Sequence, residues 1–367
     1  MDCLNLRNFT LPASLAYIGS RAFSGRTDLT SVSFPENLQY IGDCAFSGCT
    51  GLTSLAFPES LLEIYDGAFM GCSSLQTVSF PINLTRVGDE AFMGCSLLKS
   101  VVFTGALEAV GASAFEDCAA LTSVTFPARL QEIGEAAFLW CPNLKTVNFP
   151  ESLTKIGSAA FSGCTKLKKV EFSENLQVIG SFAFEGCTGL TSLTLPASLQ
   201  EIGSAAFASC NISSLSVAEG AETKTWDFLY PTTTLSTLYH ITLPASVTDA
   251  GFGTFVYNPF LASVADTPEC VLPSGTTFVS KETFRGTKVR YVWLSEETTG
   301  LGDSAFAGCE NLKYIYLPWG CKNIGEGALP AGTTILTVSA SEELREYMAE
   351  HTELKLLEVE DPYGGNG

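Results

Sequence analysis

Histidine is nearly absent from this sequence, because 367 residues include only His240 and His351. Long apolar runs are missing too: 46% of the residues are hydrophobic, but no run reaches the roughly 18 residues that a membrane-crossing helix needs. The CxxC pair of zinc modules, the GxSxG and HExxH motifs and the glycine-rich phosphate loops are all lacking. We therefore expect no enzyme, no catalytic residue, no metal site, no cofactor and no insertion of this chain into a membrane.

Positive charge is also scarce. The 20 lysines and arginines are outnumbered by 39 aspartates and glutamates, which gives a net charge of −19. Such a surface repels a phosphate backbone, so a nucleic acid is not an expected partner. We interpret the acidic residues near the C-terminus, from Glu342 to Asp361, as a solvated helix and tail.

What the sequence has in abundance is a repeat of 23 residues. An alanine–phenylalanine pair recurs at this spacing without a slip, with the phenylalanines at Phe23, Phe46, Phe69, Phe92, Phe115, Phe138, Phe161, Phe184 and Phe207. Copies of about 20–29 residues stack into solenoids, in which each copy buries its apolar face on the next. The spacing therefore predicts one continuous core that contains these phenylalanines.

The 13 cysteines follow the same grid. Most lie three residues after a repeat phenylalanine, at Cys49, Cys72, Cys95, Cys118, Cys141, Cys164, Cys187, Cys210 and Cys309. We interpret a cysteine at one repeat position as a small buried side chain that fills a tight space. Neighbouring coils about 4.8 Å apart do not forbid disulfides, but side chains that point the same way favour a ladder of free thiols.

One copy shows how the unit is built. Val32 and Phe34 alternate with serines, which is the period of a strand, and Pro35 ends the strand because proline cannot donate to a ladder. Gly42 suits a tight bend, and Asp43 is a residue type that caps a short helical turn. We expect each copy to be a strand, a bend, a short helical or 3-10 segment and a loop, with the strands stacked into a parallel sheet.

The pattern LxxVxFPxxLxxIGxxAFxGCxx closely resembles the BspA-like, or Treponema-type, leucine-rich repeat, over about residues 1–338. The expected fold is an α/β repeat protein: a right-handed leucine-rich-repeat solenoid with a parallel β-sheet on one face and short helical or 3-10 turns opposite. The resemblance implies a cell-surface or secreted protein of a host-associated microbe. Some such proteins bind extracellular-matrix proteins or other cells, and no enzymatic activity or shared binding residue is implied. The copies depart from the pattern at Tyr65, Asp117 and Trp140, which replace glycines, and at Thr104 and Ser173, which replace prolines.

The repeat also predicts how the chain is divided. The solenoid spans residues 1–338, with regular copies at 1–210, irregular copies and an insertion at 211–300, and regular copies again at 301–338. Ser339 and Glu342 have the spacing of a capping box, so residues 339–360 are expected to form a C-terminal cap with a helix. Residues 361–367 are expected to be disordered.

Binding residues are expected at the strand positions that face solvent. In the regular copies these are mostly small, and we interpret Lys145, Lys168, Lys169 and Glu171 among them as solubilising. Near the C-terminus they become aromatic, and the candidate ligand-binding residues are Tyr239, His240, Arg290, Tyr291, Trp293, Lys313, Tyr314 and Tyr316. The last two tyrosines should form a two-by-two block of rings with Tyr291 and Trp293. Exposed aromatic clusters are typical of recognition surfaces, and such rings also stack on sugars.

The function expected from these features is a surface-displayed or secreted binding or adhesion module. It would be monomeric and non-catalytic, and it would recognise a host or extracellular-matrix protein or a glycan. The alternative is a passive structural spacer that presents other domains. The spacer gains if the aromatic block is covered, for example by the 211–234 insertion with Trp226, Phe228 and Tyr230. The chain begins inside a repeat and without the features of a signal peptide, so we expect an export signal and an N-terminal segment to precede it in the natural gene.

Overall fold

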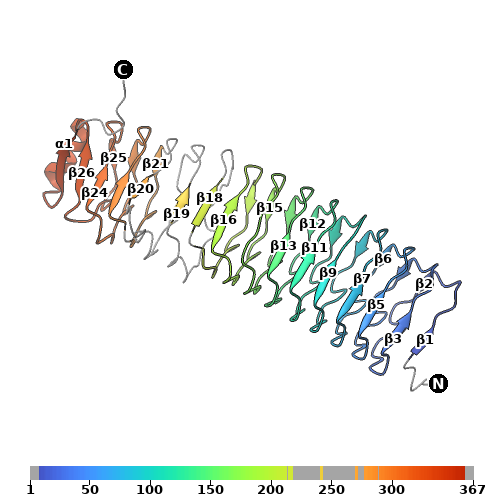
Figure 1. The fold of residues 1–367 in the computed structure, drawn as a ribbon. Coiled ribbons are helices and arrows are strands. Elements are labelled where there is room, and N and C mark those ends of the chain that lie inside the picture. Colours follow the sequence, from blue (N-terminus) through green and yellow to red (C-terminus); the bar gives the residue numbers. More distant parts are fainter. Residues whose placement is uncertain are drawn as a thin grey trace. The chain divides into compact units, whose positions relative to one another are not determined.

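The computed structural model describes residues 8–212, 214–217, 240–242, 269–271, 277–287 and 289–359. The chain divides into two compact units near Asn211, and each is built from short parallel strands stacked coil upon coil (Figure 1). Most of the irregular stretch at 211–300 and the tail at 361–367 lie outside the described residues, as do Trp226, Phe228 and Tyr230.

The first unit contains two ladders of strands, one of longer and one of shorter strands. The longer strands are β1 (Asn8–Thr10), β3 (Ser31–Ser33), β5 (Ser54–Ala56), β7 (Thr77–Ser79), β9 (Ser100–Val102), β11 (Ser123–Thr125), β13 (Thr146–Asn148) and β16 (Ser192–Leu195). The shorter strands are β2 (Tyr17–Ile18), β4 (Tyr40–Ile41), β6 (Glu63–Ile64), β8 (Arg86–Val87), β10 (Ala109–Val110), β12 (Glu132–Ile133), β14 (Lys155–Ile156), β15 (Val178–Ile179) and β17 (Glu201–Ile202). The longer strands pair in parallel within sheets of two or three strands, as β9, β11 and β13 do, which confirms the expected parallel stacking. The shorter strands form one nine-stranded parallel sheet, which was not predicted.

The repeat phenylalanines are core residues, as the 23-residue spacing predicts. From Phe46 to Phe207 they are 0–1% exposed, and successive rings stack with centroids 5.1–5.3 Å apart. A second row of phenylalanines, just after the longer strands, meets the first row edge-on, as Phe126 meets Phe138 at 71°. Each ring from Phe46 to Phe184 therefore packs against rings above, below and beside it.

The segment that carries the alanine–phenylalanine pair is a series of turns, so the expected helical or 3-10 turn is wrong. Its backbone N–H groups alternate between two kinds of acceptor. Phe46 and Gly48 donate to the carbonyl oxygens of Ala68 and Met70 in the next coil, both at 2.7 Å, while Ala45 and Ser47 donate within their own coil. This alternation uses left-handed backbone at Cys44 (φ 51°) and Gly48 (φ 71°). A helix would keep these bonds inside one coil, whereas here they tie neighbouring coils together.

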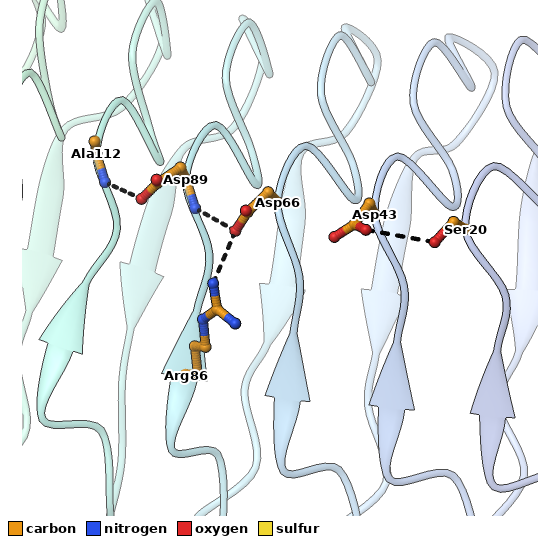
Figure 2. A network of polar contacts seen from close by, with 6 residues as sticks. All are labelled: Ser20, Asp43, Asp66, Arg86, Asp89 and Ala112. Carbon is orange, nitrogen blue, oxygen red and sulfur yellow. Dashed lines mark hydrogen bonds and ion pairs between the residues drawn. The ribbon is translucent and has the colours of Figure 1, made fainter.

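The aspartates that follow the bend also act between coils and do not cap their own turns. The Asp66 carboxylate accepts the backbone N–H of Asp89 at 3.0 Å, and the Asp89 carboxylate accepts that of Ala112 at 2.7 Å (Figure 2). Arg86 also reaches the Asp66 carboxylate, at 3.1 Å. Because each acceptor serves the following coil, these side chains add a polar row along the outside of the bends.

The cysteines whose side chains the structure describes are free, and all but Cys44 are buried, which confirms the expected ladder of thiols. Each repeat thiol from Cys49 to Cys210 donates to the phenylalanine carbonyl oxygen of the preceding coil, as Cys141 does to Phe115 at 3.3 Å. Burial raises the pKa of Cys95 and Cys164 to about 12. Cysteine thus fills the space that the sequence predicts and also supplies a donor that alanine lacks.

The second unit repeats this construction. Its five-stranded sheet runs in the order β20 (Glu269–Val271), β22 (Tyr291–Trp293), β24 (Tyr314–Tyr316), β26 (Thr334–Thr337) and β27 (Lys355–Glu358). A sheet of shorter strands contains β21 (Phe278–Val279), β23 (Gly300–Leu301) and β25 (Asn323–Ile324). Two further strands, β18 (Ser214–Val217) and β19 (His240–Thr242), pair in parallel.

The C-terminal segment contains the expected helix, α1 (Glu342–Glu350). Its N-cap is Ser341, whose hydroxyl accepts the Leu344 N–H at 3.1 Å, so the expected capping box at Ser339 and Glu342 is wrong. Leu344 packs into the core of the second unit. The chain then adds β27, which pairs with β26 and lengthens the sheet beyond the expected end of the repeats. In the described part of the chain, no helix has the length and apolar character to cross a bilayer.

Candidate functional site

The predicted aromatic block lies on β22 and β24. The alternation of side chains along each strand determines which face of the sheet it occupies. Val292 and Ile315 point into the core and are 1% and 0% exposed. The residues on either side of them therefore face outward, because side chains alternate along a strand. The parallel register pairs Tyr291 with Tyr314 and Trp293 with Tyr316.

The four rings meet in pairs across the two strands. Tyr291 and Tyr314 stack with centroids 5.6 Å apart and planes 8° from parallel. Trp293 and Tyr316 are 5.5 Å apart and inclined by 31°. Tyr314 is 38% exposed, while Tyr291 and Trp293 are partly exposed. Three of the four rings thus present aromatic surface to solvent.

Tyr316 differs from this expectation, because it is only 1% exposed. Its register neighbours are Trp293 on β22 and Leu336 on β26, and its hydroxyl donates to the Glu296 carboxylate at 2.8 Å. Neighbouring coils and one carboxylate therefore cover it. Tyr316 supports Trp293 from the side and is not itself a contact surface.

The outward face continues past the predicted block onto β26 and β27. In register with the Trp293 row stand Leu336 and Leu357, and Leu357 is 50% exposed. Val338, the next outward residue after Leu336, is 42% exposed. We call the outward residues of β22, β24, β26 and β27, with Val338, the C-terminal face. The sequence analysis did not include its last strand, because β27 follows a helix and lies outside the repeat pattern.

Cations lie at one edge of the C-terminal face. Arg290 and Lys313 immediately precede β22 and β24, and Lys355 begins β27. All three side chains are exposed, and none forms an ion pair with the described residues. The face therefore combines apolar rings with local positive charge in a chain whose net charge is −19.

Trp319 is an exposed aromatic residue that the sequence analysis did not single out. It lies in the turn after β24 and is 60% exposed, and the Lys322 ammonium is 5.1 Å from its ring centroid. Lys322 also pairs with Glu343 at the start of α1, at 3.3 Å. A signal was available, because most other copies have glutamate or alanine at the position after the proline.

Two of the eight predicted site residues cannot be placed in this surface. Tyr239 lies outside the described residues, and so does the side chain of His240, whose backbone belongs to β19. The structure brings together the other predicted aromatics and the two cations Arg290 and Lys313. Their role in binding stays a prediction.

The outward positions of the first unit present a different surface. On β3, β5, β7, β9, β11 and β13 they are mostly serine and threonine, and nearly all are exposed. Lys145 and Lys168 are exposed, and Lys169 forms an ion pair with Glu171. Side chains this short give a ligand little to hold. Among the longer strands that the structure describes, those of the C-terminal face carry the large, partly exposed aromatic side chains.

Potential metal ligands and reactive side chains do not gather into a site in the part of the chain that the structure describes. No three side chains of histidine, cysteine, aspartate or glutamate in this part of the chain come together to share a metal ion. A cavity of about 460 Å³ in the second unit is lined by Arg285, Thr287, Glu310 and Asn311 together with glycine and alanine. It pairs no nucleophile with a histidine.

Comparisons with known proteins identify relatives of the repeat. A family profile for the BspA type leucine rich repeat region, in six copies, matches residues 1–122, 108–230 and 260–361. This profile describes a repeat region and not a catalytic domain. A comparison with curated proteins gave no match.

The chain is similar to several solved structures. A leucine-rich repeat protein from Bacteroides ovatus is 22% identical, with a TM-score of 0.60 over 98% of this chain and 94% of that one. A leucine rich cell surface protein from Faecalibacterium prausnitzii is 22% identical, with a TM-score of 0.47 over 93% of this chain and 90% of its own. The pneumococcal vaccine antigen PcpA is 21% identical, with a TM-score of 0.48 over 97% and 89%. The first likeness shows a shared solenoid architecture.

Proposed function

Because this chain belongs to the BspA-type leucine-rich repeat family, we propose that it is a non-catalytic binding module whose C-terminal face contacts a protein ligand. The observation that carries the proposal is the stacked and partly exposed set Tyr291, Trp293 and Tyr314. Tyrosine and tryptophan dominate the energetics of protein interfaces.

The chemistry of the face favours a protein with an apolar patch and acidic residues around it. Leu336, Val338 and Leu357 extend the rings with aliphatic surface, which suits a protein better than a sugar. Arg290 and Lys313 are unpaired with described residues and would meet acidic groups at the rim. The proposal also includes display of the protein at the cell surface or its secretion. This part rests on the family resemblance alone.

The experiment is a binding screen of the whole chain against panels of extracellular-matrix and other host proteins, with a glycan panel in parallel. The test variant is Trp293→Ala with Tyr314→Ala, and the matched control is Trp140→Ala, which removes a 56% exposed tryptophan from a turn in the first unit. Loss of two contact aromatics at about 1–2 kcal/mol each should weaken binding by roughly 30-fold or more.

The outcomes separate the candidate functions. A protein ligand lost in the double variant and retained by the control supports the C-terminal face. Equal binding by the wild type, the double variant and the control would show that the C-terminal face is not the binding site. A glycan lost in the same way would change the ligand class. Wild type that binds nothing on either panel would favour the passive spacer.

A further inference from the structure

A row of tyrosines lies on the sheet of shorter strands in the first unit. Tyr17 of β2 and Tyr40 of β4 are neighbours in the parallel register, and the Tyr40 ring centroid is 6.5 Å from that of Tyr65, which immediately follows β6. Tyr17 is 49% exposed, and the other two are half-buried. Tyr17, Tyr40 and Tyr65 are called the tyrosine row below.

Tyr65 breaks the repeat at a crowded position. The other eight regular copies have glycine there, from Gly19 to Gly203. A Cβ added at Gly42 would lie 2.8 Å from the backbone nitrogen of Ser20, and one added at Gly88 would lie 2.7 Å from the carbonyl carbon of Tyr65. Packing thus favours glycine at this bend, and a tyrosine in its place is a local departure of the kind that marks functional surfaces.

The chain itself shows which group this surface accepts. The Arg86 guanidinium lies 5.1 Å from the Tyr65 ring centroid, and the same guanidinium is 3.1 Å from the Asp66 carboxylate (Figure 2). One ring and the adjacent carboxylate therefore hold an arginine from the next coil. The attraction combines a cation–π contact with a charge-assisted hydrogen bond.

Carboxylates also lie beside Tyr17 and Tyr40, but no described cation lies over these two rings. Asp43 follows Tyr40 by three residues, is exposed, and has a hydroxyl contact from Ser20 at 3.4 Å. Glu63 is the register neighbour of Tyr40 on β6. Neither carboxylate forms an ion pair with the described residues, and no described cation stacks on Tyr17 or Tyr40.

We infer that the tyrosine row is a second binding surface, which takes an arginine-bearing segment of a partner protein. Its guanidinium groups lie over Tyr17 and Tyr40 and pair with Asp43 and Glu63, as Arg86 does with its own ring and carboxylate. The net charge of −19 also draws such a segment toward the chain.

The test uses the full chain and a fluorescein-labelled heptapeptide of alternating serine and arginine, with binding measured by fluorescence anisotropy at low and at moderate salt. A second peptide replaces each arginine with citrulline, which keeps the shape and removes the charge. Tyr17→Ala with Tyr40→Ala should weaken binding of the arginine peptide about tenfold. Circular dichroism of each variant verifies that the surface change leaves the fold intact.

Charge-matched variants separate a local site from the general negative field. Asp43→Asn with Glu63→Gln removes two charges beside the tyrosine row, and Glu132→Gln with Glu201→Gln removes two from other coils of the same sheet. The first pair should weaken binding several-fold and the second should leave it nearly unchanged. Equal losses in both pairs would overturn the inference, because attraction would then depend on net charge alone.

Two further results bear on the ligand. Equal binding of the citrulline peptide would overturn cation recognition and would leave ring stacking as the only contribution. Trp293→Ala with Tyr314→Ala should not change binding of the arginine peptide, so failure at the C-terminal face and failure at the tyrosine row can be told apart. A neutral glycan that competes with the peptide at the tyrosine row more strongly than free arginine would also contradict the proposal.

Discussion

Replacement of Phe138 by alanine is the most direct test of how this protein is held together. The side chain is 0% exposed and is stacked between Phe115, at 5.3 Å, and Phe161, at 5.2 Å. Phe126 meets it edge-on at 5.8 Å. The change removes roughly 150 Å² of buried apolar surface, and at about 25 cal/mol per Å² this gives about 4 kcal/mol. That value lies within the 3–5 kcal/mol typical of Phe→Ala in a core.

The assay is urea unfolding of the whole chain, followed by circular dichroism and by tryptophan fluorescence. Coincident curves permit a two-state free energy, which long repeat arrays do not always allow. Phe138→Leu is the volume control and should cost less than about 1.5 kcal/mol. Phe23→Ala is the positional control, because Phe23 is half-buried in the first described coils, and its loss should be clearly smaller. A loss below about 1 kcal/mol for Phe138→Ala, or equal losses at the two positions, would refute the continuous stacked core.

Four other expectations concern the thiols, the bends and the cap. Burial raises the pKa of Cys95 to about 12, so its thiol should resist maleimide in the native chain while the partly exposed Cys44 reacts, as peptide mapping by mass spectrometry will show. Because Cys95 and Cys164 bind their protons more tightly in the folded than in the unfolded chain, the stability that these two thiols contribute is complete below about pH 8.5 and is lost as the pH rises toward 12, which pH-dependent urea titrations measure. In Gly111→Ala the new Cβ would lie 2.4 Å from the carbonyl carbon of Gly88, so we expect a loss of at least about 1–3 kcal/mol, and an unchanged melting temperature would contradict the tight bend. Ser341→Ala removes the α1 cap bond and should cost about 1 kcal/mol by chemical denaturation, whereas Ser339→Ala should cost little.

The stacking of coils could be predicted from the sequence because it depends on one number, the period. Identical side chains 23 residues apart come into contact only if the backbone repeats in register, and the Phe46–Phe69 stack is the direct result. The thiol ladder follows from the same argument. Its hydrogen bonds do not, because the acceptor of Cys141 is the Phe115 carbonyl in another coil.

The local errors have one physical cause. Gly42, Asp43 and Phe46 read alone resemble the start of a capped helix, but the Phe46 N–H has a better placed acceptor in Ala68 of the next coil. The sequence of one 23-residue copy, taken alone, does not show that this acceptor is present. Contacts between coils override local propensity here, as tertiary context often does.

The candidate surfaces were predictable to different degrees. The pairing of Tyr291 with Tyr314 follows from the repeat, but the burial of Tyr316 depends on Leu336 and Glu296. The tyrosine row was not predicted, because the sequence analysis expected one strand per copy and not the short second strand on which Tyr17 and Tyr40 lie. The replacement of glycine by Tyr65 was visible as a departure, but its partner Arg86 was not.

The uniform contacts of the phenylalanine stack have a consequence for how this protein could change over time. Any interior coil of the first unit meets neighbours almost identical to those it would meet elsewhere in the stack. Duplication or loss of one 23-residue segment of the gene product would therefore leave every junction chemically intact and alter the reach of the array by about 4.8 Å. A change of another length has to be absorbed outside the stack, as the second unit illustrates: Phe284 and Phe306 lie 22 residues apart, and their rings still stack with centroids 4.8 Å apart.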